Sequence, residues 1–206
     1  MKKQTDYIRD IAEIRSMMER SSKFLSLSGW AGIMAGIYAL TGAYMAYRFL
    51  DFNPDELFYG VAENSSSGLL KVILLAIIIL ILALDTAVFI SWKRAGKRGE
   101  KLWNPTAQQL LVNMAVPLIA GGLLILFAIS KGLIGLIIPF SLLFYGLALF
   151  NAGRNTYREV KILGLIEISL GLISFWFVEY GLFFWTLGFG LFHIIYGIYM
   201  NYKYER

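Results

Sequence analysis

The sequence contains no cysteine, and only 16% of its residues are charged. Without cysteine, the chain has no disulfide framework, no thiol nucleophile and no thiolate metal site. An ordinary soluble domain has about 25% charged and about 45 to 50% apolar residues. Here 58% of the 206 residues are hydrophobic, and the mean hydropathy is +0.63. The composition therefore excludes an ordinary soluble domain and indicates an integral membrane protein.

Motifs for catalysis and cofactors are also missing. The single histidine, His193, cannot supply two axial ligands to a haem, and no HExxH, GxSxG or nucleotide-binding pattern is present. We therefore expect no catalytic residues and no cofactor, and we assign no metal site. The net charge of +5 follows the ends of the apolar segments rather than forming a patch on a soluble surface, so we expect no nucleic-acid partner.

Six apolar segments succeed one another between charged or Pro/Gly/Asn-containing breaks. At about 1.5 Å per residue, each is long enough for a helix that crosses a bilayer. We expect an all-α integral membrane protein in which six transmembrane helices, arranged as hairpins, form a bundle over residues 24–206. The segments are roughly 24–48, 69–92, 107–130, 132–152, 160–178 and 181–201.

The basic residues predict the orientation of the bundle. Sixteen of the 19 Lys and Arg residues fall in the first 23 residues, the 93–106 loop, the 153–161 turn and the C-terminus. Because cytoplasmic loops are enriched in Lys and Arg, both termini are expected in the cytoplasm. The short outer loop 49–68 is acidic and contains a glycosylation sequon at Asn64, a match that turn-type residues also produce by chance.

A sequence echo predicts a duplicated hairpin. Gly-Leu pairs ten residues apart occur at the turn between segments three and four and again between segments five and six. Each set is followed by Tyr-Gly and then Asn. The echo consists of Gly122, Gly132, Tyr145 and Asn151 in the first copy and Gly171, Gly181, Tyr196 and Asn201 in the second. We interpret it as a duplication of the two hairpins.

Three stretches resemble segments of a known group of proteins. They are SLSGWAGI at 26–33, FYGLALFNA at 144–152 and LGFGLFHIIYG at 187–197. These stretches resemble uncharacterised small six-span membrane proteins of Bacteroidetes-type bacteria. The resemblance implies a bacterial inner (cytoplasmic) membrane and carries no reaction or functional residue with it.

The N-terminal tail, residues 1–23, has the pattern of an amphipathic helix. Tyr7, Ile11, Ile14 and Met18 form an apolar stripe of helical period, and the opposite face mixes acidic and basic residues. A helix that only grips anionic lipid would be mostly basic on that face. Two interpretations stay open: docking on the cytoplasmic side of this protein, and binding of a cytoplasmic or membrane protein partner.

Small residues line one side of the first span. Alanines recur at every fourth position with two glycines beside them, which allows a second helix to approach closely in lipid. The set is Ala31, Gly32, Ala35, Gly36, Ala39 and Ala43. The helix that they contact is either another span of this chain or a second copy in a homo-oligomer.

Ionisable residues at similar depth predict a polar layer inside the membrane. Asp85, Glu167 and His193 lie about 12, 9 and 15 Å from the basic residues that mark the cytoplasmic ends of their spans. Asn113 and Tyr145 fall near the same depth. We expect the three ionisable side chains to converge inside the bundle, because charged groups in membranes face protein or water.

Three functions are compatible with such a layer. The first is a scaffold or accessory protein in which the polar network fixes the packing of the helices. The second is a small proton- or cation-coupled transporter or channel that uses Asp85, Glu167 and His193. The third is an intramembrane enzyme, metal protein or haem protein, which the missing motifs disfavour.

Overall fold

The computed structural model describes residues 28–50, 52, 66–97, 99 and 103–205. Every regular element among these residues is a helix, so the all-α prediction is confirmed for them. The tail 1–23 and most of the acidic loop 49–68 lie outside the described residues. The amphipathic helix expected in the tail therefore stays a prediction.

The helices follow the apolar segments closely but not at every boundary. The long elements are α2 (Gly29–Phe49), α4 (Ser66–Lys97), α5 (Pro105–Ser130), α6 (Ile137–Ala152) and α7 (Arg158–Ser174). The last segment is divided into α8 (Gly181–Trp185), the π-helix η3 (Thr186–Phe192) and α9 (His193–Tyr204). Short 3-10 helices, η1 (Ile134–Leu136) and η2 (Val178–Tyr180), precede α6 and α8.

Four of the described helical stretches are long and apolar enough to cross a membrane. They are Gly68–Lys97, Pro105–Ser130, Ile134–Ala152 and Val178–Tyr204. Helix α7 is only 17 residues long and carries both Lys161 and Glu167. Helix α2 is also not among these four. Length and composition thus support a multi-pass membrane protein with at least these four spans.

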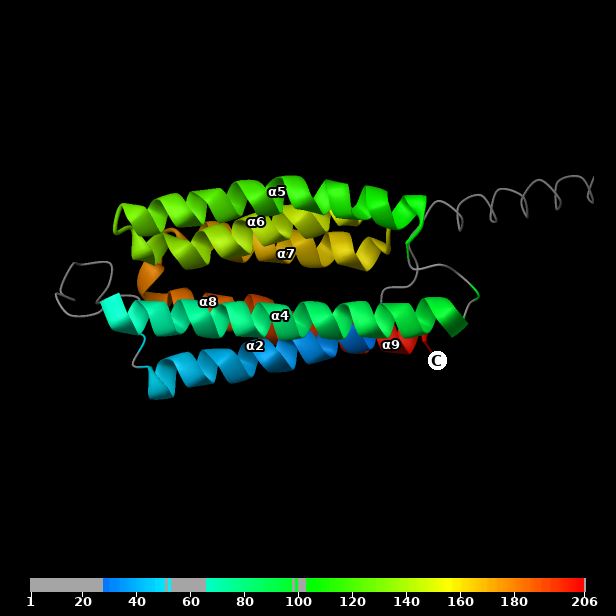
Figure 1. Cartoon of the computed structure of the whole chain (residues 1–206), viewed down its shortest axis with the longest axis horizontal. Helices are drawn as coiled ribbons and strands as arrows, with labels where there is room; N and C mark the ends of the chain where they lie inside the picture. The colour runs from blue at the N-terminus through cyan, green and yellow to red at the C-terminus, as the bar shows by residue number, and fades with distance from the viewer. Residues whose placement is uncertain (1–27, 51, 53–65, 98, 100–102, 206) are drawn as a thin grey trace, which may run out of the picture.

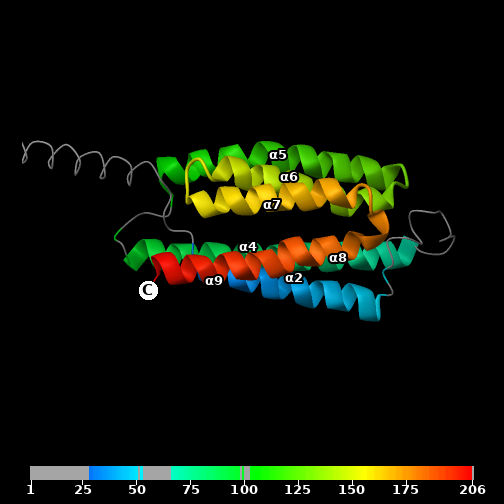
Figure 2. The same ribbon diagram turned by 180° about the vertical axis from the view of Figure 1, so that it is seen from behind.

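The helices lie in two layers, seen from opposite sides in Figures 1 and 2. Helices α5, α6 and α7 form one layer, in which α6 packs against both of its neighbours. Helices α2 and α4 and the segment from α8 to α9 form the other, in which α2 packs against α4, η3 and α9. Helix α4 thus has α2 as its main neighbour within the described chain.

Glycines bring α6 and α7 into backbone contact. A Cβ atom added to Gly146 would lie 2.6 Å from the amide nitrogen of Ile168 and 2.8 Å from the carbonyl oxygen of Gly164. A Cβ atom added to Gly164 would lie 2.6 Å from the amide nitrogen of Phe150. Such close approach is typical of small residues at helix interfaces in lipid. It also positions Tyr145 and Glu167, which neighbour this contact, on adjoining helices.

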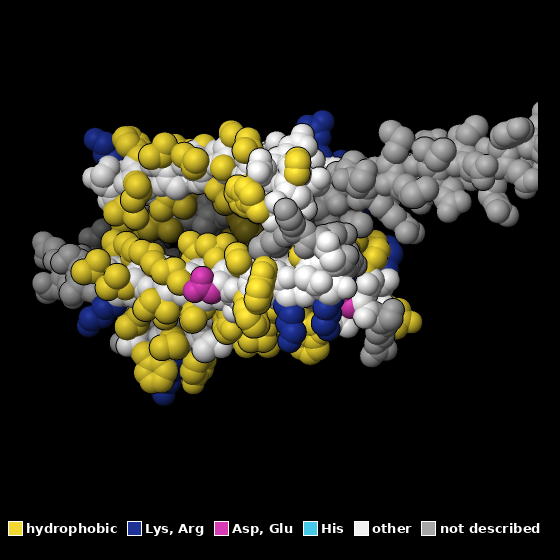
Figure 3. All heavy atoms as spheres, turned by 45° about the vertical axis from the view of Figure 1, so that its right-hand side comes forward, with side chains coloured by type: hydrophobic (Ala, Val, Ile, Leu, Met, Phe, Trp, Pro, Cys, Tyr) yellow, Lys and Arg dark blue, Asp and Glu magenta, His cyan; other side chains and the backbone are white. Residues whose placement is uncertain are grey.

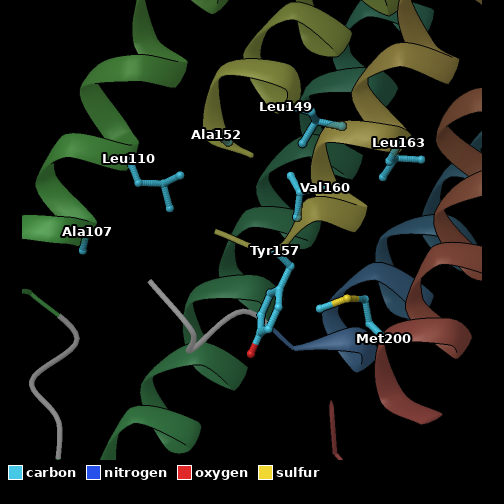
Figure 4. Close-up of a cluster of buried hydrophobic side chains, with 8 residues drawn as sticks. All are labelled: Ala107, Leu110, Leu149, Ala152, Tyr157, Val160, Leu163 and Met200. Atoms are coloured by element: carbon cyan, nitrogen blue, oxygen red, sulfur yellow. The ribbon is translucent and has the colours of Figure 1, made fainter. Parts of the chain in front are cut away.

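A hydrophobic cluster joins the two layers at the end of the bundle where α5, α7 and the 153–157 turn meet α9. Figure 4 shows Tyr157, at the start of α7, and Met200, on α9, approaching each other. The buried members are Ala107, Leu110, Leu149, Ala152, Tyr157, Val160, Leu163 and Met200. This cluster links α9 to the α5–α7 layer.

Glu205 connects three helices at the same end of the bundle. Its carboxylate accepts hydrogen bonds from the amide of Gly29 at 2.6 Å and from the hydroxyl of Ser28 at 3.0 Å. It also pairs with the guanidinium of Arg94 at 2.5 Å. A carboxylate at a helix N-terminus satisfies amides that have no partner within the helix. Glu205 therefore holds the start of α2 against the ends of α4 and α9.

The two outer turns are similar in form, but the echoed glycines do not occupy equivalent positions in them. Each turn contains a 3-10 helix directly before the next α-helix. Gly132 lies before its 3-10 helix with a φ of 72°, in the left-handed region. Gly181 follows its 3-10 helix and begins α8 with a φ of −52°. The spacing that indicated a duplication thus does not align the two turns.

Candidate functional site

Three of the predicted polar residues lie together between α6, α7 and α9. The Nδ1 atom of His193 is 3.4 Å from Oε1 of Glu167, and its Nε2 atom is 2.9 Å from the hydroxyl of Tyr145. Glu167 is 0% exposed and His193 is 5% exposed. We call Tyr145, Glu167 and His193 the polar cluster. The three side chains meet where α6, α7 and α9 lie side by side.

The π-helix η3 shapes the side of the polar cluster formed by the last span. The carbonyl oxygen of Gly188, in η3, lies 2.9 Å from Nδ1 of His193. The imidazole ring makes this contact, and His193 is the residue that directly follows η3. The ring of Phe189 stacks on the imidazole with 5.9 Å between centroids and 16° between planes. The contacts with Gly188 and Phe189 therefore hold the imidazole beside Tyr145 and Glu167.

The hydrogen-bond geometry determines which nitrogen of His193 carries a proton. A carbonyl oxygen can only accept, so the Nδ1 atom facing Gly188 is the protonated one. In a neutral imidazole, Nε2 then accepts a hydrogen bond from the Tyr145 hydroxyl. Neither carboxyl oxygen of Glu167 has a hydrogen-bond partner among the described residues. The carboxyl group of Glu167 instead has the His193 ring at ion-pair distance.

The pair can be electrically neutral in two ways. Either a carboxylate faces an imidazolium, or a protonated carboxyl group faces a neutral imidazole. The two states differ in whether one proton is on the carboxyl group of Glu167 or on Nε2 of His193, and both avoid an isolated charge, which is unfavourable away from water. Chemically, the arrangement can store or pass a proton. Because its three side chains come from three helices, the polar cluster also fixes how α6, α7 and α9 pack together.

Asp85 does not join the polar cluster, which corrects the expected convergence. It is exposed on α4, a helix that has no substantial contact with α6 or α7. The neighbouring residue Thr86 turns toward α2, where its hydroxyl lies 3.2 Å from that of Tyr38. Depth along the helix was a sound guide for Glu167 and His193. It carried no information about which way Asp85 would face.

Asn113 also lies apart from the polar cluster. Its side-chain amide donates to the amide oxygen of Asn155 at 2.9 Å, and Asn155 donates in turn to Gln109 at 3.2 Å. These three residues join α5 to the turn between α6 and α7. Asn113 therefore stabilises that turn.

The small residues of the first span pack within the chain. A Cβ atom on Gly32 would lie 3.3 Å from the carbonyl oxygen of His193, and one on Gly36 would lie 2.7 Å from that of Gly190. Ala31, Ala39 and Ala43 are buried, and Ala35 is partly buried. Gly32 and Gly36 therefore pack against η3 and α9 of the same chain, which supports the contact with another span.

Several residues that build the site had no clear signal in the sequence. Gly188 and Phe189 read as ordinary residues of an apolar span, and nothing in the sequence marks η3 as a π-helix. The close pair Gly188 and Gly190 was the available hint, because glycine in a span often marks a close approach. The hydrogen bond between Ser28 and Glu205 also had no signal in the sequence, because the two residues are 177 positions apart.

We expect Gly188→Ala to destabilise the protein. The new Cβ atom would lie 2.5 Å from Oε2 of Glu167 and 2.7 Å from Cδ2 of Leu142, both in fully buried side chains. Overpacking of this kind costs about 1 to 3 kcal/mol. SDS-driven unfolding in mixed micelles measures the change. Gly122→Ala is the matched control, since nothing lies within 4 Å of its Cβ position. An equal effect in both variants would contradict the prediction.

A second ionic group links α7 to α9 near the end of the bundle. Glu159 accepts hydrogen bonds from Nζ of Lys203 at 2.6 Å and from the hydroxyl of Tyr204 at 3.1 Å. Glu159 precedes the span predicted at 160–178. Burial of its carboxyl group acts to raise the pKa, but the hydrogen bonds from Lys203 and Tyr204 outweigh burial and hold the pKa below its usual value.

The lowered pKa of Glu159 predicts a pH-dependent contribution to stability. Because the pKa is lower in the folded state, the contribution is complete above the unfolded pKa and is lost as pH falls through the folded pKa. The stability difference between the wild type and Glu159→Gln should shrink as pH is lowered from about 6 to about 3. Unfolding at a series of pH values tests this.

Comparisons of the chain with protein-family models, with curated proteins and with solved structures found no match. Among the described residues, no group of three or more His, Asp or Glu side chains is placed to hold a metal ion. The function is therefore argued from the geometry of the chain itself.

Proposed function

We propose that this protein is a six-span inner-membrane scaffold or accessory protein with both termini in the cytoplasm. The observation that carries the proposal is the enclosure of the polar cluster. Glu167 is 0% exposed, its ion-pair partner His193 is on another helix, and His193 is hydrogen-bonded to Tyr145 on a third helix. A closed polar network that joins three helices fixes their packing. That role needs no access for a substrate.

The packing of α2 and α7 supports six spans rather than four. Helix α2 contacts the last span at Gly29, Gly32 and Gly36 and contacts α4 at Gly42, so it runs beside two apolar helices. Helix α7 runs beside α6 from Lys161, which lies against Gly153, to Gly171, which lies against Leu143. A helix that runs along a membrane-spanning neighbour for this length crosses the same bilayer.

The orientation rests on the basic residues at the two ends of the helices. Arg94, Lys97, Arg158 and Lys203 lie at the ends that the sequence assigns to the cytoplasm, whereas Lys131 follows α5 at the opposite end. Reporter fusions at the C-terminus and within residues 51–66 test the orientation. A cytoplasmic signal from the 51–66 loop would contradict it.

Flux measurements separate the scaffold from the alternative, a small proton- or cation-coupled transporter. We expect vesicles that contain the purified protein to show the same proton and cation leak as protein-free vesicles under an imposed gradient. The alternative is favoured by one specific observation: within the described part of the chain, the carboxyl oxygens of Glu167 have no hydrogen-bond partner. Flux that disappears in Glu167→Gln, which cannot exchange a proton, would establish the transporter and overturn the scaffold.

A further inference from the structure

Asp85 lies at the centre of an exposed hydrophobic face of α4. In an α-helix, the residues three, four and seven positions away lie on the same side. All six residues at these spacings from Asp85 are large, hydrophobic and exposed: Ile78, Ile81, Leu82, Val88, Phe89 and Trp92. We call these six residues and Asp85 the α4 face. In Figure 3, hydrophobic side chains cover much of the visible surface, and an acidic side chain lies among them.

Contacts with α2 fix the rotation of α4 and so fix where Asp85 points. Thr86 lies against Tyr38, and Ile79, seven residues earlier on the same side, lies against Gly42. Because successive residues of a helix are rotated by about 100°, Asp85 is turned away from α2. None of the 18 residues in the most apolar window of this helix is buried. The α4 face is therefore free of packing within the described part of the chain.

A carboxylate surrounded by hydrocarbon is unfavourable, and such groups in membranes pair with other groups or face water. Among the described residues, Asp85 has neither a hydrogen-bond partner nor an ion-pair partner. Lys71 and Lys93, on the same helix, are about 21 and about 12 Å away along the axis. A carboxyl group in hydrocarbon becomes neutral by taking up a proton or by pairing with a cation, and a cation that pairs with Asp85 would have to come from outside the described part of the chain.

We infer that the α4 face binds a transmembrane helix of another protein, and that this helix presents a Lys or Arg side chain at the depth of Asp85. The inference rests on the proposed accessory function and names the partner's chemistry. A second copy fits poorly. Two copies with the same orientation are related by an axis normal to the membrane, which preserves depth and would bring Asp85 beside Asp85 or beside hydrophobic residues.

The test uses designed helices as probes. The full chain carries a fluorescent donor in phosphatidylcholine vesicles, and a single-span Leu/Ala peptide carries the acceptor. One peptide has a Lys at the depth of Asp85, and a second has Leu at that position. We expect energy transfer to show about tenfold tighter binding of the Lys peptide. Asp85→Asn, which keeps the side-chain shape, should remove the preference.

A charge exchange and a control complete the design. Asp85→Lys should prefer a peptide with Asp in place of Lys. Glu179→Gln removes an exposed carboxylate at another place and should keep the wild-type preference. Equal binding of the Lys and Leu peptides by the wild type would overturn the inference. A second result would also overturn it. In that result, copies of the chain show energy transfer to one another, Asp85→Asn abolishes this transfer, and the Lys peptide binds no more tightly than the Leu peptide.

Failure here and failure of the proposed function give different results. If the α4 face has no preference for a basic helix but the vesicles show no flux, only the inference about Asp85 is overturned. If the vesicles show flux that depends on Glu167, the accessory function itself is overturned, whatever the peptides do.

Discussion

We expect His193→Ala to lower the free energy of unfolding by about 3 kcal/mol, because removing one member of a buried pair leaves the other without compensation. In this variant Glu167 loses its ion-pair partner at 3.4 Å, and the hydroxyl of Tyr145 loses its hydrogen-bond acceptor. The carboxyl group of Glu167 cannot reach bulk water by a small movement, since Glu167 is fully buried. SDS-driven unfolding in mixed micelles gives the magnitude.

Two further variants separate the ion pair from the cavity that alanine leaves. His193→Leu fills the space but cannot pair with Glu167, so it should retain most of the loss. A double-mutant cycle with Glu167→Gln should show coupling of about 1 kcal/mol or more between the two positions. If the effects of His193→Ala and Glu167→Gln simply add, the pair contributes no mutual stabilisation and the cluster does not act as a unit.

We expect Gly164→Val to be about as damaging, with a loss of about 3 kcal/mol, for a steric reason. The Cβ atom would lie 2.6 Å from the amide nitrogen of Phe150 and 2.7 Å from the carbonyl oxygen of Gly146. Both are backbone atoms of α6, which cannot move aside as a side chain can. The helices would have to separate, and the polar cluster between them would lose its geometry.

The matched control for Gly164→Val is Gly122→Val. It introduces the same side chain into a long helix, at a glycine with nothing within 4 Å of its Cβ position. Unfolding of the two variants under the same conditions should differ by about 2 kcal/mol or more. Similar losses would mean that the close approach of α6 and α7 is not what Gly164 provides.

The polar cluster and the α4 face indicate two separate roles for acidic residues in one bundle. Glu167 is enclosed with His193 and holds helices of the chain together. Asp85 is exposed on the apolar α4 face and is available to a partner. Under this division, Glu167→Gln should change stability, whereas Asp85→Asn should change association.

The sequence alone was sufficient for the helical nature of the chain and for most element boundaries. Long apolar segments must satisfy their backbone groups internally in lipid, which leaves helices as the outcome for segments of this length. The segments predicted at 107–130 and 160–178 lie close to α5 and α7. Helix α4 extends to Lys97, five residues past the predicted end, because a basic helix end need not stop at the bilayer surface.

Within the polar layer, sequence reasoning determined depth but not direction. Depth follows from the rise of about 1.5 Å per residue, so Tyr145, Glu167 and His193 could be placed at one level by counting from the basic ends of their spans. Direction depends on which helices become neighbours. In soluble proteins a polar face reveals this, but α4 is hydrophobic nearly all round, and lipid is as apolar as the protein core.

Only the tertiary structure therefore decided that Asp85 faces outward while Glu167 faces inward. The contacts of Tyr38 with Thr86 and of Gly42 with Ile79 set the rotation of α4. The contacts of the His193 ring with the carbonyl of Gly188 and with Phe189 hold that ring in place. Both are consequences of helix packing, which small residues permit at many places along these spans and which the order of residues in a single helix does not specify.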